Sequence, residues 1–170
     1  DPDGHMRRAL EFFPVPEIAR NVLAEYFIPG GKPADAPYRR VPFYSIHPPR
    51  RLTELTLVAN FVEVFLAKEG HAGLIGINYL EKIQLPCLAS LCGAMLAGVD
   101  YVLMGAGIPR EIPGILDRLA RLEDVTLRVN VAGAAGGQTF DMHFHPRHFV
   151  PPEITALSRP EVLAIISSAT

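Results

Sequence analysis

The chain has 170 residues, of which 49% are hydrophobic and 20% are charged, and its formal net charge is −2. This length suits one ordinary domain, and this composition supports a packed core and excludes a disordered chain. Because no block of basic residues occurs, nucleic-acid binding has little electrostatic support. No apolar stretch reaches about 18 residues without a charge, so we expect no membrane span and no membrane partner.

The start of the chain and its cysteines indicate a cytoplasmic location. The first residues, DPDGHMRRAL, lack the apolar centre of a signal peptide. Cys87 and Cys92 are the only cysteines, and they lie five residues apart in an apolar stretch. We expect two buried thiols in a reducing compartment, because no other metal ligands of matching spacing lie nearby.

The first part of the chain predicts helices that are separated by breaks. Residues 7–13 and 18–27 have helical character, and prolines and glycines follow each of them. Residues 41–46 form a candidate strand, although Pro42 inside it favours an edge strand or an extended loop. Residues 52–69 are apolar almost all round and predict a buried helix.

Periodicity alone does not decide such an apolar run, so a strand over residues 55–59 stays open as an alternative to the helix.

The stretch from Gly73 to Pro109 is the centre of the functional argument. It predicts a strand at residues 74–80, a helix at 88–97 that ends before Gly98, and a strand at 101–104. Two apolar strands joined through a helix form a parallel βαβ unit, and ligands bind such sheets beyond the carboxyl ends of the strands. We therefore expect Asn78 and the loop Gly105-Ala106-Gly107 to lie at two neighbouring strand ends.

The last part of the chain adds a helix, a hairpin and a strand. Residues 112–122 are amphipathic, and residues 125–131 and 139–144 alternate between apolar and polar side chains. The two alternating runs predict an antiparallel hairpin. A hairpin is foreign to a repeating βα pattern, so we interpret residues 125–145 as an insertion that lies away from the ligand. Residues 162–166 predict a last buried strand.

These elements predict an α/β fold, a partial (β/α)8 TIM barrel with an inserted β-hairpin. The parallel strands are few, whereas a complete barrel typically needs about 250 residues and a parallel sheet needs both faces covered. We expect residues 1–170 to be an internal portion of one barrel domain, without its first strand and its C-terminal part. The alternative is a closed domain that is completed by something absent from these residues.

Two stretches, ANFVEVFLAKEGHAGLIGINYLEKIQ and AMLAGVDYVLMGAGIPREIPGILDRLA, resemble the nitronate monooxygenase family, formerly called 2-nitropropane dioxygenases. The resemblance extends over nearly the whole chain. It implies a TIM barrel that holds FMN at its C-terminal face and oxidises alkyl nitronates, a small-molecule substrate, with molecular oxygen. The family's glycine-rich first strand, its Gly-Gly-His segment with the catalytic histidine, and its glycine-rich phosphate loops have no counterpart here.

The resemblance implies that Asn78 contacts the flavin and that Gly105, Ala106 and Gly107 line the flavin and substrate pocket. An amide at a strand end can donate and accept hydrogen bonds at the edge of a flavin ring, and glycines allow close backbone approach. In the alternative interpretation, Asn78 caps a turn and the glycines only turn the chain. The catalytic residue is unknown. Lys82 is the second-rank candidate for acid–base work, and His71 is also conceivable.

Three histidines, His143, His145 and His148, cluster with Asp141 in the hairpin region. We interpret them as a solvated face and assign no metal.

Two other functions stay open. One is a flavin-dependent enoyl reductase of the fatty-acid or polyketide type, which needs a nicotinamide donor. The other is an inert fragment that forms a homo-oligomer, or that pairs with the missing part of the barrel, to cover its open edges.

Overall fold

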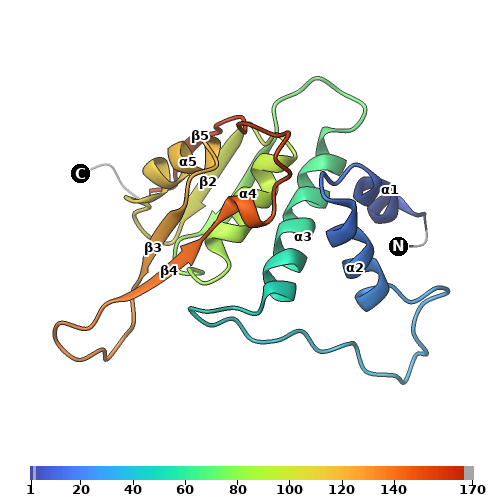
Figure 1. The fold of residues 1–170 in the computed structure, drawn as a ribbon, viewed down its shortest axis with the longest axis horizontal. Coiled ribbons are helices and arrows are strands. Elements are labelled where there is room, and N and C mark those ends of the chain that lie inside the picture. Colours follow the sequence, from blue (N-terminus) through green and yellow to red (C-terminus); the bar gives the residue numbers. More distant parts are fainter. Residues whose placement is uncertain (2, 167–170) are drawn as a thin grey trace.

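The computed structural model describes residue 1 and residues 3–166, and it is a mixed α/β structure (Figure 1). In that part of the chain, helices and strands follow the order predicted from the sequence, with one exception in residues 41–46. The helices are α1 His5–Glu11, α2 Pro16–Tyr26, α3 Arg50–Lys68, α4 Cys87–Leu96 and α5 Ile112–Ala120, with a 3-10 turn η1 at Pro146–His148; the strands are β1 Gly76–Leu80, β2 Tyr101–Gly105, β3 Val125–Val129, β4 Phe140–Phe144 and β5 Glu161–Ala164.

The predicted βαβ unit is confirmed. Strands β1, β2 and β5 form a parallel sheet in that order, with Asn78 opposite Leu103 and Val102 opposite Val162. Helix α4 connects β1 to β2, and Gly98 follows it in the left-handed conformation with φ 73°. The described strands do not close into a barrel.

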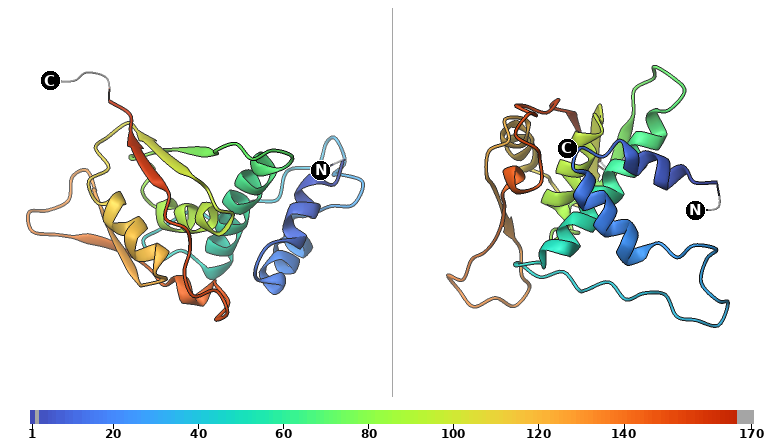
Figure 2. Two further views of the ribbon diagram at one scale, coloured as in Figure 1. Left: turned by 90° about the horizontal axis from the view of Figure 1, so that it is seen from above. Right: turned by 45° about the vertical axis from the view of Figure 1, so that its right-hand side comes forward.

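Within residue 1 and residues 3–166, only one face of the parallel sheet is covered. Val102 and Met104 are fully buried on the face that packs against helices, and α4 and α5 lie on the same side of the sheet (Figure 2, left). On the opposite face, Leu163 is 48% exposed and Leu80 is also exposed. The prediction of a buried last strand is therefore wrong, because β5 lies at an edge of the sheet with one face uncovered. We call this surface the open face.

Helix α3 joins the sheet layer to the N-terminal helices. It is a helix along its whole length, so the alternative strand at residues 55–59 does not form. One side of α3 packs on α4, and the other side carries α1 and α2 (Figure 1). The ring of Phe13 meets that of Phe61 edge-on, with centroids 5.1 Å apart, and Phe12 stacks on Phe65 at 4.9 Å.

Residues 27–49 form a long irregular segment, which we call the arm. The candidate strand at residues 41–46 lies in the arm and is wrong, because this run pairs with no other described strand. Pro42 removes a backbone hydrogen-bond donor from this run, and Pro48 and Pro49 remove two more from the arm just after it. Phe43 is 97% exposed. The arm therefore joins α2 to α3 without contributing to the sheet (Figure 2, right).

Strands β3 and β4 form the predicted antiparallel hairpin, with Val125 opposite Phe144. Alternate side chains on the two strands, among them Leu127 and Met142, are buried in the main core. None of the helices in the described part of the chain is long and apolar enough to cross a membrane.

Candidate functional site

The turn after β1 and the loop after β2 meet at the carboxyl end of the parallel sheet. The backbone N–H of Glu81 donates to the carbonyl oxygen of Gly105 at 2.8 Å, which continues the β1–β2 pairing by one more bond. This contact places the two predicted site segments side by side, at the end of the sheet where ligands of parallel α/β folds bind.

Asn78 lies in the middle of β1 rather than at its end, because pairing with β2 continues as far as Leu80. Its side chain is on the open face, is exposed, and makes no hydrogen bond with any described residue. The strand partner of Asn78 is Leu103, and Gly105 lies two positions further along β2, hence on the same face. The structure therefore brings Asn78 and Gly105 to one surface. It does not support the alternative that Asn78 caps a turn.

The loop Gly105-Ala106-Gly107 has the backbone features of a close approach. Ala106 adopts a left-handed conformation with φ 60°, which residues with a Cβ rarely take. A Cβ at Gly105 would meet the side chain of Ile165 at 3.5 Å, so this glycine is covered. The carboxylate of Glu81 occupies the space that a Cβ at Gly107 would fill. Ala106 and Gly107 are exposed, and they form the accessible part of the loop.

A cleft of about 320 Å³ lies beside this loop. It is bounded by the turn after β1, the first residues of α4 and α5, and strand β3. Its lining includes Glu81, Gln84, Arg110 and Arg128. The expectation that the hairpin lies away from the site is therefore wrong: the backbone N–H of Asn130, just after β3, donates to Oε1 of Gln84 at 2.8 Å.

Sequence reasoning missed most of the polar residues of this cleft. The sequence did not predict Glu81, Gln84, Arg110 or Arg128 as site residues. For Glu81 the available signal was its position directly after β1, and for Arg110 it was its position in the loop after β2. Nothing in the sequence linked Arg128 to the site, because the packing of the hairpin against α5 is a tertiary contact.

The remaining site candidates differ in their surroundings. Burial, with a smaller contribution from Glu81, raises the pKa of the Cys87 thiol to about 12, so this thiol stays protonated at neutral pH. Lys82 is exposed in the turn after β1 and has no hydrogen bond or ion pair with any described residue. His71 lies before β1, at the opposite end of the sheet, where Nδ1 accepts from the N–H of Gly73 at 2.9 Å. That position excludes it from the site.

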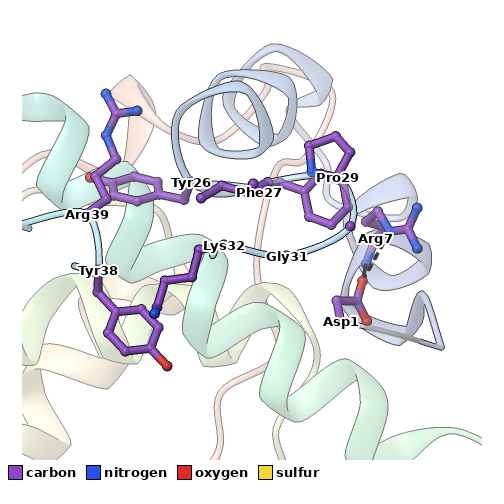
Figure 3. Close-up of a pocket in the computed structure, with 11 residues that line it drawn as sticks. Asp1, Arg7, Tyr26, Phe27, Pro29, Gly31, Lys32, Tyr38 and Arg39 are labelled. Carbon is purple, nitrogen blue, oxygen red and sulfur yellow. Dashed lines mark hydrogen bonds and ion pairs between the residues drawn. The ribbon is translucent and has the colours of Figure 1, made fainter. Parts of the chain in front are cut away.

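A larger cavity, of about 680 Å³, lies between the end of α2 and the arm (Figure 3). Its charged groups have partners within the chain: Arg7 pairs with Asp1 at 3.3 Å, and Lys32 lies over the ring of Tyr38 at 4.6 Å. Helix α3 lies between the parallel sheet and the end of α2, which lines this cavity (Figure 1). The cavity is therefore not part of the predicted site.

No group of three or more histidine, cysteine, aspartate or glutamate side chains among the described residues could hold a metal ion. Cys87 and Cys92 are both free thiols. No protein-family model, no curated protein and no solved structure matches this chain.

Proposed function

We propose that the open face and the loop after β2 form part of the flavin site of an FMN-dependent oxidoreductase of the nitronate monooxygenase type. The observation that carries the proposal is that Asn78 is exposed on the same face of the sheet as Gly105, and that Ala106 and Gly107, directly after Gly105, are also exposed. The resemblance of the two long sequence stretches supports the same assignment.

The arrangement of the sheet supports a barrel as the parent fold. In the order β1-β2-β5, each strand is added on the same side of the previous one, as in a singly wound barrel. A doubly wound sheet would reverse its strand order and place helices on both faces. Here α4 and α5 lie on one face (Figure 2, left), which corresponds to the outside of a barrel. The open face would then be the barrel interior.

The residues of the open face have the chemistry that a flavin ring needs. Asn78 offers both a donor and an acceptor to the polar edge of the ring. Leu80 and Leu103 flank it with apolar surface, against which a flat ring could pack. The left-handed turn at Ala106 leaves backbone atoms accessible beside this surface. We infer that this portion would hold the ring, and that the phosphate would be held by residues other than these.

The chemistry that bound FMN would supply is the transfer of electrons from the anionic carbon of a nitronate to molecular oxygen. The residues of this chain would position the flavin and the nitronate. Lys82 and Arg110 lie at the carboxyl end of the sheet and offer positive charge to an anionic substrate. Lys82 remains a candidate for proton transfer.

The test is flavin binding and oxygen consumption by the protein expressed from its complete reading frame. We expect it to purify yellow, or to take up FMN on reconstitution, and to consume oxygen when an alkyl nitronate is added. Asn78→Ala should weaken FMN binding about tenfold, the effect of losing one to two hydrogen bonds. The matched control is Asn21→Ala, an exposed asparagine of α2 on the other side of α3.

Three results would redirect the assignment. A colourless protein that cannot be reconstituted with FMN would reject it. Reduction of a bound flavin by NAD(P)H, followed by turnover of an enoyl thioester, would favour the enoyl reductase. The 170-residue chain alone should bind FMN weakly, because glycine-rich phosphate loops of the family type do not occur in it; tight binding by this chain would contradict the division of roles proposed above.

A further inference from the structure

A second cleft, of about 480 Å³, lies where the end of the arm and the first turn of α3 meet α4, β4 and η1. Four of the six histidines of the chain line it: His47, His143, His145 and His148. We call it the histidine cleft. It is formed by elements other than the parallel sheet and is distinct from the cleft beside Gly107.

The floor of the histidine cleft is apolar and well packed. Leu88 and Ala89 of α4, together with Met142 and Phe144 of β4, are buried there. Helix α4 contributes no charged side chain to the lining. A concave apolar floor with a few polar groups on its rim is the usual form of a small-molecule site, and the volume lies within the usual range for such sites.

The rim of the histidine cleft carries donors and imidazoles. The guanidinium of Arg50 lies over the ring of Phe149 at 5.1 Å and donates to the carbonyl oxygen of His148 at 3.1 Å. The rings of His145 and His148 are 5.1 Å apart. Nδ1 of His143 lies 3.0 Å from the hydroxyl of Thr126. These histidines do not converge on a shared metal position within the described residues.

The carboxylates near the rim are already paired. Glu54 binds Arg50 at 2.8 Å, Asp124 binds Nδ1 of His145 at 2.9 Å, and Asp141 lies 3.4 Å from Nε of Arg128. Among the other titratable groups, Tyr44 of the arm and Arg50 of α3 line the cleft, Glu54 of α3 reaches Arg50, and Asp124 before β3 reaches His145. Each of these carboxylates already has a partner within the chain, which lessens its repulsion of an anion at the rim.

From these observations we propose that the histidine cleft binds a small organic anion with an apolar body, such as an aromatic or aliphatic carboxylate. The apolar body lies on the floor formed by Leu88 and Met142, and the carboxylate faces His47, His143 and His148 at the rim. Imidazoles in general gain a proton as the pH falls through about 6.5, so binding tightens toward acidic pH.

The probe for the test is 2-naphthoate, with the uncharged 2-naphthalenemethanol as its matched analogue. We expect one naphthoate to bind per chain, about tenfold more tightly at about pH 6 than at about pH 8, since one charge-assisted hydrogen bond has roughly this effect. The alcohol should bind more weakly and with the same affinity at both pH values. Isothermal titration calorimetry gives the stoichiometry and both affinities.

Histidine variants locate the site. His47→Gln and His148→Gln alter exposed side chains, and each should lower the affinity at about pH 6 at least about threefold and reduce the pH dependence. His5→Gln, in α1, is the control and should change neither. In the NMR spectrum of the imidazole protons, naphthoate should shift signals of the four histidines of the cleft and leave those of His5 and His71 in place.

Two outcomes would overturn the proposal. The first is naphthoate binding that is absent, or independent of pH and of both cleft histidines. The second is binding that is lost in Leu163→Lys, a variant of the open face, while His47→Gln and His148→Gln bind as the unaltered chain does. In that case the apolar sheet surface, and not the histidine cleft, would be the site.

Discussion

At the scale of single residues, burial decides which groups of the central unit can react. Burial raises the pKa of the Cys87 and Cys92 thiols to about 12, and it also holds the pKa of Tyr79 above its usual range. The hydroxyl of Tyr79 lies 2.7 Å from Oδ1 of Asn60 and 3.1 Å from the carbonyl oxygen of Ser90, and these two acceptors share its one proton. These three groups therefore stay protonated at neutral pH, and they are unsuited to nucleophilic work.

The raised thiol pKa values predict a loss of stability at alkaline pH. The unfolded chain releases the thiol protons near the ordinary value of 9.0, whereas the folded chain keeps them until about 12. Between those values the folded state binds more protons, so the free energy of unfolding falls as pH rises, by up to about 1.4 kcal/mol per pH unit for each thiol. Urea unfolding at several pH values measures this slope, and the double variant Cys87→Ala/Cys92→Ala should flatten it. An equal slope in both proteins would contradict the prediction.

Asp100 predicts the opposite dependence at acidic pH. Hydrogen bonds from Lys68 at 2.7 Å and from the N–H of Ile75 at 2.8 Å lower the pKa of its carboxyl. The resulting stabilisation is present above the ordinary pKa of about 3.8 and is lost as pH falls through the lower, folded value. Asp100→Asn should cost about 1–2 kcal/mol at neutral pH and remove this acid dependence.

The control for Asp100→Asn is Asp117→Asn, which removes a surface ion pair of 2.8 Å with Arg159. We expect it to cost less than about 1 kcal/mol. Urea midpoints of the two variants at neutral pH and at about pH 3 would refute the assignment if they were the same.

At the scale of elements, the close crossing of α3 and α4 determines how the sheet layer joins the helical layer. The backbone of Leu57 in α3 fills the space that a Cβ at Gly93 in α4 would need. This glycine therefore allows the backbones of the two helices to approach closely. The hydrogen bond between Tyr79 and Asn60 also joins β1 to α3.

Gly93→Ala should separate α3 from α4 and destabilise the protein by about 1–3 kcal/mol, the usual cost of overpacking. Gly114→Ala is the matched substitution, because nothing lies within 4 Å of a Cβ at that position in α5. There the greater helix propensity of alanine should raise stability by about 0.5–1 kcal/mol. Urea midpoints measure both changes, and a stabilising effect at Gly93 would show that the crossing is looser than described.

Periodicity predicted most elements because, within a few residues, their apolar side chains fall on one face and their polar side chains on the other. It failed where a distant segment decides the outcome. Residues 41–46 have strand-like composition, but Pro42 and the lack of a pairing partner leave them in the arm. The apolar residues of β5 resemble a buried strand, yet nothing in the described chain covers one side of it. The hairpin was expected away from the site, and only its packing places Asn130 beside Gln84.

At the scale of the whole molecule, the main feature is the open face, an apolar sheet surface that no described element covers. Leu80 at the end of β1, Leu163 in β5 and Ile165 just after β5 are each about half exposed, and β1 and β5 are the two edge strands of the described sheet. A contiguous apolar patch next to unpaired strand edges favours association. The small number of predicted parallel strands indicated that part of the sheet would be uncovered. It could not show that the uncovered part is one face only.

The 170-residue chain should therefore associate with itself, as shown by a sedimentation coefficient that increases with concentration. Leu163→Lys places a charge on the open face, in the edge strand β5, and should shift the chain toward the monomer. Phe43→Ser removes an apolar side chain that is even more exposed but lies in the arm, and it should have little effect. Association that responds to Phe43→Ser and not to Leu163→Lys would assign self-contact to the arm instead.

The arm has a consequence for how the molecule comes apart. Arg39 and Arg40 are exposed in its irregular backbone, so trypsin should nick the native chain there before it digests the helices. The N-terminal piece would still be clamped to α3 by the rings of Phe12 and Phe13. The cut protein should elute from a sizing column as one particle, and its two pieces should separate only in denaturant.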